Sequence, residues 1–220
     1  MDSPAPSSRC AWRWIPSLYF AQGIPNVAVA TLAVVMYKNL GVSNTDVALY
    51  TSWLYLPWVI KPLWSPFVDL RGTKRAWIVG LQFVIGVALG SIALTVPAPF
   101  YFQATLAVFW LIAFSSATHD IAADGFYLLA LPKTQQAAFV GVRSTFFRLS
   151  MIAGQGGLVF LAGSLATSTG DIAHAWAVVF GLLAGFFFLA GWYHSRALPR
   201  LSEDTPPTER GNPWQGWWTV

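Results

Sequence analysis

The sequence predicts an all-α polytopic membrane protein with six transmembrane helices. Its 220 residues are 55% hydrophobic and only 10% charged, whereas soluble domains carry about a quarter charged residues. Six apolar runs are long enough to cross a hydrocarbon core of about 30 Å, which needs about 20 helical residues. These observations exclude a soluble enzyme, a disordered chain and a disulfide-stapled secreted module, and the single cysteine, Cys10, cannot form an internal disulfide.

The six runs are joined by short polar or Pro- and Gly-containing links. Backbone groups cannot face lipid unpaired, so each run should be a helix. A membrane β-barrel would instead show segments of about ten residues with alternating polarity, which the sequence lacks. The predicted spans are 14–37, 47–68, 76–96, 100–131, 137–165 and 175–193.

The first span carries a Gly and a Pro near its middle, in Gln22-Gly-Ile-Pro-Asn26. Gln22 and Asn26 are one helical turn apart and share a face. Broken helices at the midplane are a device by which membrane transporters expose polar groups, although a proline kink tolerated by packing is an equal alternative. Because the apolar run is long, we expect a retained helix rather than a cleaved signal peptide.

The basic residues set the orientation, since Lys and Arg gather in cytoplasmic loops. An inside amino terminus leaves Lys38 alone outside and returns the polar tail after the sixth span to the cytoplasm. Scattered along one rim, these residues favour membrane orientation over nucleic-acid binding. The basic residues then placed in the cytoplasm are Arg9, Arg13, Arg71, Lys74, Arg75, Lys133, Arg196, Arg200 and Arg210.

Six ionisable residues fall inside the predicted spans. A charge at mid-membrane costs about 2.5–3.5 kcal/mol on insertion scales, so each is a candidate functional residue. They are Lys61, His119, Asp120, Asp124, Arg143 and Arg148.

The fourth and fifth spans should form an antiparallel hairpin about the turn at 132–136, which sets the register of four of these charges. Asp120 is then level with Arg148, and Asp124 is level with Arg143. The two aspartates share one helix face, but the arginines are five residues apart and cannot both face one neighbour. The charges either neutralise one another within the hairpin or bind an anionic group or a proton, and the two roles are compatible.

Two further features have open interpretations. Lys61 lies about seven residues from the inner end of the second span, so it either joins the same polar layer or snorkels to the headgroups. Gly154-Gln-Gly-Gly157, in the fifth span, favours close helix packing.

The loop after the second span, Asp69-Leu-Arg-Gly-Thr-Lys-Arg75, resembles the gate motif of the major facilitator superfamily. The motif residues here are Asp69, Arg71, Gly72, Lys74 and Arg75. Asp69 would cap or pair near a helix end, and the basic residues would lock one state of a cytoplasmic gate.

A second set of segments is similar to the AmpG-type muropeptide permeases and their relatives, which include acetyl-coenzyme A transporters. These segments are Ala117-Thr-His-Asp-Ile-Ala-Ala-Asp124, 18–25 and 58–69. The resemblance covers residues 14–195 and implies a proton-coupled secondary transporter in a bacterial inner membrane. It places Asp120, Asp124, the arginines and Lys61 in the polar core, with His119 where related proteins often carry an amide.

Such transporters have twelve helices in two halves, with the solute bound between them. We therefore expect a cytoplasmic tail at 1–13, a six-helix bundle at 14–196 and the start of the loop joining the halves at 197–220. The chain would be the amino-terminal half, with a carboxy-terminal half or a second copy as its partner.

The expected function is the transport of a small anionic or amino-sugar-containing solute together with protons. The alternative is a membrane sensor or assembly partner that transports nothing. A metalloenzyme is disfavoured, because no third imidazole is expected at the depth of His119 and the arginines would repel a cation. We expect no enzymatic activity, cofactor or metal.

Overall fold

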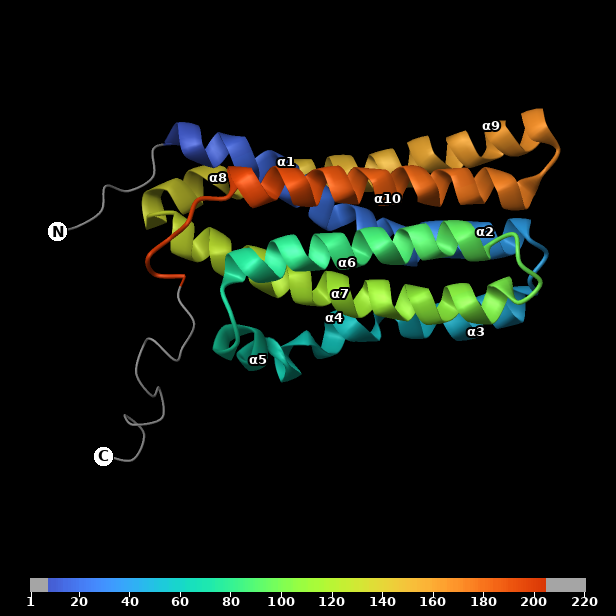
Figure 1. The fold of residues 1–220 in the computed structure, drawn as a ribbon, viewed down its shortest axis with the longest axis horizontal. Helices are drawn as coiled ribbons and strands as arrows, with labels where there is room; N and C mark the ends of the chain where they lie inside the picture. The colour runs from blue at the N-terminus through green and yellow to red at the C-terminus, as the bar shows by residue number, and fades with distance from the viewer. Residues whose placement is uncertain (1–7, 205–220) are drawn as a thin grey trace.

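The computed structural model describes residues 8–204, and within that range the chain is helical without any strand (Figure 1). The first predicted span is α1 (Ser8–Val27), a π-helical segment (Ala28–Leu32) and α2 (Ala33–Asn39). The third is α6 (Lys74–Thr95), the fourth α7 (Tyr101–Ala130) and the sixth α10 (Ile172–Ala197). The fifth is α8 (Lys133–Ile152), a π-helical segment (Ala153–Leu158) and α9 (Val159–Thr169).

The second predicted span, 47–68, is helical but not continuous. It comprises α3 (Asn44–Ser52), a 3-10 turn (Trp53–Tyr55), α4 (Leu56–Ile60), a 3-10 turn (Lys61–Leu63) and α5 (Ser65–Leu70). Pro57, Pro62 and Pro66 recur every four or five residues. Each lacks the N–H that an α-helix needs, so no long uninterrupted helix forms here.

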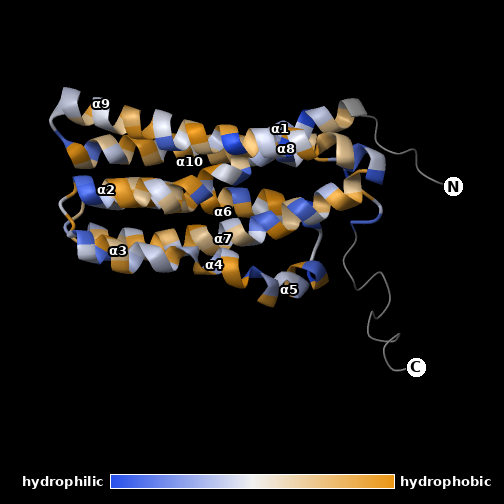
Figure 2. Cartoon of the chain, turned by 180° about the vertical axis from the view of Figure 1, so that it is seen from behind, coloured by the Kyte–Doolittle hydropathy of each residue, from blue (hydrophilic) through white to orange (hydrophobic). Residues whose placement is uncertain are grey.

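Five helical stretches are long and apolar enough to cross a membrane. They are Cys10–Asn39, Lys74–Thr95, Tyr101–Ala130, Lys133–Thr169 and Ile172–Ala197, and the interrupted α3 to α5 runs beside them (Figure 1). Hydrophobic residues lie along all of these helices, and hydrophilic ones are more frequent in the half of the bundle that holds α5 (Figure 2). The expected polytopic, all-helical architecture is therefore confirmed.

The helix neighbours differ from those of a simple hairpin. α8 packs mainly against α1 and meets α7 only near the turn that joins them, whereas α6 packs against both α7 and α10. Glycines permit the close approach of α1 and α8. A Cβ on Gly23 would lie 1.8 Å from Oγ of Ser150, and a Cβ on Gly154 would lie 2.3 Å from Cγ1 of Val27.

The bundle core consists of two apolar clusters separated by a buried polar layer. One cluster includes Trp14, Leu18 and Phe126, near the end of the bundle where α1 begins and α10 ends; we call this the motif end. The other includes Leu32 and Phe180, toward the far end. The polar layer consists of Gln22, Gln82, Ser115, Ser116, His119, Asp120, Ser150 and His194, all buried.

The expected tails lie partly outside the described residues. These are positions 1–7 of the predicted amino-terminal tail and positions 205–220 of the predicted inter-half loop, including Arg210.

Candidate functional site: a buried polar layer and its gate loop

The structure pairs Asp124 of α7 with Arg143 of α8. Nη2 of Arg143 lies 2.6 Å from Oδ1 of Asp124, and the hydroxyl of Tyr19 donates to the same oxygen at 3.1 Å. The guanidinium group also lies over the rings of Tyr19 and Tyr127, at 4.6 and 4.8 Å from their centroids. The carboxylate and the guanidinium therefore neutralise each other within an aromatic cradle.

Asp120 has a different environment from Asp124, one turn away. Its side chain is buried, with 8% of the residue surface exposed, and Gln22 is 7% exposed. Gln22 and Trp58 lie close enough to hydrogen-bond to its carboxyl group, and Lys61 lies near enough to act on it electrostatically. Oδ1 of Asp120 and Oε1 of Gln22 nevertheless lack a hydrogen-bond partner among the described residues. Two buried acceptors thus lie unsatisfied on neighbouring side chains, which costs free energy unless a donor is supplied.

The remaining charged candidate, Arg148, is exposed on α8 and forms no ion pair with a described residue. Asp120 and Arg148 were expected at the same depth, but they form no ion pair because α7 and α8 separate beyond their turn. Asn26 is half-buried in the last turn of α1, directly before the π-helical segment.

His119 faces a different set of partners from Asp120. Its Nε2 lies 3.2 Å from Nε2 of Gln82, and Oε1 of Gln82 lies 3.0 Å from Nδ1 of His194. Nε2 of His194 is in turn 3.0 Å from Oγ of Ser17. This chain of hydrogen bonds joins α7, α6, α10 and α1. His119 is thus part of an interhelical link on the far side of α7 from the Asp124 pair.

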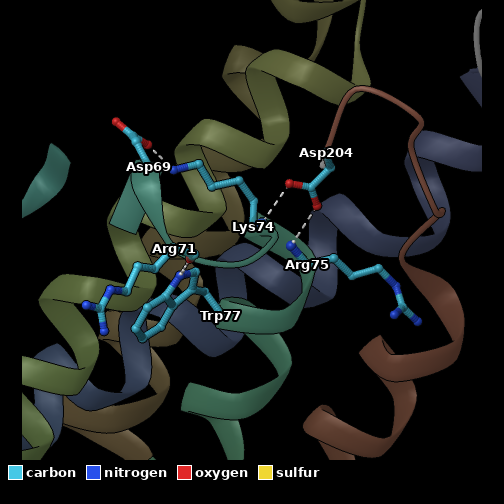
Figure 3. Close-up of polar contacts among 6 residues, drawn as sticks. All are labelled: Asp69, Arg71, Lys74, Arg75, Trp77 and Asp204. Carbon is cyan, nitrogen blue, oxygen red and sulfur yellow. Dashed lines mark hydrogen bonds and ion pairs between the residues drawn. The ribbon is translucent and has the colours of Figure 1, made fainter. Parts of the chain in front are cut away.

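The loop at 69–75 is a tight turn held by contacts between its own side chains and those of neighbouring residues (Figure 3). The side chains of Asp69 and Lys74 form an ion pair across it. Gly72 adopts φ 71°, a left-handed conformation that glycine accepts without a steric penalty. The indole N–H of Trp77 donates to the carbonyl oxygen of Arg71, whose guanidinium lies 4.8 Å from the centroid of Phe67.

The same loop is bonded to the segment that follows α10. Asp204 accepts hydrogen bonds from the backbone N–H groups of Lys74 and Arg75, at 2.7 and 3.0 Å (Figure 3). The side chain of Thr73 accepts from the backbone N–H of Ala76 at 3.1 Å. A carboxylate thus satisfies the free N–H groups at the positive end of α6. Nε of Arg75 donates to the carbonyl oxygen of Leu198 at 3.2 Å, directly after α10.

Replacing Asp204 with alanine should therefore destabilise the motif end. Losing the cap should cost about 1 kcal/mol, or a fall of ~2–4 °C in thermal unfolding measured in detergent. The matched control is Glu203→Ala, an exposed acid one residue earlier, which should change little. Equal effects of the two substitutions would show that net charge, not the cap, is responsible.

Several contacts of this site were not predicted from the sequence. Tyr19 is three residues before Gln22 and Tyr127 three after Asp124, so shared helix faces could have indicated both. Gln82 is an amide within the apolar run 76–96, and its polarity there could have indicated a buried hydrogen-bonding residue. His194 lies just beyond the sixth predicted span, 175–193, and only the tertiary packing of α10 on α6 brings it to Gln82. Among the described residues, no cluster of three or more His, Cys, Asp or Glu side chains could hold a metal ion.

The chain is similar in sequence to known membrane proteins. The family model described as the BT1 family matches residues 21–205. The anhydromuropeptide permease of Escherichia coli K12 is 29% identical over 153 residues, which cover 66% of this chain and 30% of the permease. The uncharacterized membrane protein YBR220C of Saccharomyces cerevisiae is 31% identical over 144 residues, covering 53% of this chain and 25% of that protein. No solved structure matches the chain.

These matches confirm the resemblance inferred from the motifs. They also show that the chain spans less than a third of the length of these relatives, since the matched regions cover 25–30% of them.

Proposed function

The chain belongs to the BT1 family, and from this premise we propose that it contributes the first half of a proton-coupled transporter for a small solute. The observation that carries the proposal is the pair of unsatisfied buried oxygens, on Asp120 and Gln22, beside the neutralised Asp124–Arg143 pair. A buried carboxyl oxygen without a hydrogen-bond partner needs either a proton or a donor group of a solute. Alternation between the two would couple solute movement to protons.

The expected solute is anionic or contains an amino sugar. Lys61 acts on Asp120 and Arg143 pairs with Asp124, while Arg148 lies exposed on α8. The three positive charges of these residues exceed the two negative ones, which favours an anion. The hydroxyl and amide groups of an amino sugar can donate to the unsatisfied oxygens. A relative named as an anhydromuropeptide permease makes anhydromuropeptides the first compounds to test.

The missing part of the site would come from a second six-helix half or a second copy of the chain. Arg148 is exposed and unpaired among the described residues, as expected of a group that faces a partner across a central cavity. The loop at 69–75, with its hydrogen bonds to Leu198 and Asp204, would then lie on the cytoplasmic side of an inner-membrane protein.

The test is uptake of labelled anhydromuropeptide into vesicles that contain the chain with its second half or copy. Asp120→Asn together with Asp124→Asn should reduce uptake driven by a proton gradient to background, because neither side chain can then exchange a proton. The control is Asp171→Asn, since asparagine caps a helix as well as aspartate does and Asp171 caps α10. Gradient-dependent uptake at the wild-type rate in the double variant would contradict the proposal.

A further inference from the structure

A groove of about 430 Å³ runs along the outer surface between α1, α8 and α10, and His194 of the polar layer lines one end of it. Its inner walls are apolar and largely aromatic. They are formed by Phe20, Phe146, Phe186, Leu189 and Ala190. Along α10 the groove extends from Phe186 to His194, about 12 Å at 1.5 Å per residue.

The polarity of the groove changes along its length. Pro16, Ser17, Tyr193 and His194 line the part nearest the motif end. Ser17 and His194 hydrogen-bond to each other, so they present few free polar groups to an occupant. The interior is therefore suited to a hydrocarbon chain that enters from the motif end.

On each flanking helix an arginine lies within one turn of a lining residue, toward the motif end of the groove. On α1, Arg13 precedes Ser17 and Phe20 by four and seven residues, so the three share one helix face. On α10, Arg196 follows Tyr193 and Leu189 by three and seven residues and shares their face. The hydroxyl of Tyr193 donates to the carbonyl oxygen of Arg13, which joins the two helix ends.

Both arginines are exposed, and neither forms an ion pair with a described residue. The guanidinium group of Arg196 lies 4.2 Å from the centroid of Trp192, itself 56% exposed on the same turn. Tryptophan and arginine at a helix end are typical of the headgroup level of a bilayer. This end of the groove thus combines positive charge with interfacial position.

The groove is distinct from the proposed solute site. Phe20 is one residue from Tyr19, about 100° around α1, so the groove and the Asp124 pair use different faces of that helix.

We propose that this groove binds one anionic phospholipid of the surrounding bilayer, with an acyl chain between α1, α8 and α10 and its phosphate between Arg13 and Arg196. Charge complementarity selects the anionic headgroup, and basic pockets between membrane helices are known to bind such lipids. The acyl chain fills the space that α8 leaves beside α10, and the phosphate links the motif ends of α1 and α10. The proposal does not depend on transport.

The test uses the full chain in nanodiscs that contain phosphatidylglycerol carrying a photoreactive group in its acyl chain. Labelling should map to peptides of α1, α8 and α10 that line the groove, and phosphatidylcholine with the same chain should label them weakly. Ala190→Phe, which fills the groove, should remove that labelling. Label spread evenly over all membrane-facing helices would overturn the proposal.

The headgroup is tested with Arg13→Gln combined with Arg196→Gln. Each basic side chain at an anionic surface contributes about fivefold in affinity, so binding of phosphatidylglycerol in native mass spectrometry should weaken about 25-fold. The matched control is Lys133→Gln with Arg200→Gln, which removes two exposed charges outside the groove and should preserve binding. Equal losses in the two double variants, or cross-linking of the groove to a second copy of the chain in place of lipid, would reject the lipid as occupant.

Discussion

Gly154→Ala should destabilise the chain by about 2 kcal/mol, which corresponds to a fall of ~4–8 °C in thermal unfolding. The new Cβ would lie 2.3 Å from Cγ1 and 3.0 Å from Cβ of Val27. Valine is branched at Cβ and stiff, so its side chain cannot rotate away from the contact. The clash must therefore be relieved by separating α1 from α8.

The same substitution should have the opposite effect on stability at two neighbouring glycines. Gly156 and Gly157 lie in the same π-helical segment, but a Cβ on either meets nothing within 4 Å. Alanine there should be neutral or stabilising by up to about 1 kcal/mol, because glycine is the poorer helix former. Val27→Ala removes the two methyl groups and should return part of the lost stability to the Gly154→Ala variant, and a double-mutant cycle measures this coupling. Equal destabilisation at all three glycines would contradict steric contact as the cause.

The contact lies at the π-helical segments of both helices, since Gly154 is within one segment and Val27 directly precedes the other. Ala28–Leu32 and Ala153–Leu158 are in contact, and Thr31 accepts a hydrogen bond from Gln155 at 3.5 Å. Beyond them, α2 packs against α3 and α9 against α10. Figure 1 shows α2 and α9 diverging toward the far end. The close packing of α1 on α8 thus fixes the point from which the two helices separate.

The all-helical architecture and five of the six predicted spans could be read from the sequence because they depend on local composition. Lipid imposes a length and a polarity on each spanning segment, and both are visible in a single run of residues. The interruption of 47–68 was also encoded locally, by Pro57, Pro62 and Pro66, although hydropathy alone conceals it.

Lateral packing was not predictable in the same way. Helices adjacent in sequence were expected to pair, but α8 packs on α1, which precedes it by more than 100 residues. The choice depends on complementary shapes, such as Gly23 against Ser150, that no hydropathy pattern contains. For the same reason the sequence related Asp124 to Arg143, close to their shared turn, but did not relate Gln82 to His194.

Arg143→Gln should have the second large effect, by leaving Asp124 charged without its partner. Removing one member of a buried pair costs about 3–5 kcal/mol, whereas exposed pairs contribute about 0–1 kcal/mol. The side chains of Arg143 and Asp124 are 27% and 41% exposed, so we expect an intermediate loss of about 1–2 kcal/mol. The guanidinium stacking on Tyr19 and Tyr127 is lost as well. Thermal unfolding in detergent measures the sum.

The double variant, Asp124→Asn with Arg143→Gln, separates the structural role of the pair from its proposed role in transport. It removes both charges, so no uncompensated carboxylate remains and most of the lost stability should return. Uptake should not return, because neither residue can then carry charge or exchange a proton. If uptake recovers together with stability, the pair serves only to hold α7 and α8 together near their turn. If stability returns without uptake, charge at this position is required for solute movement itself.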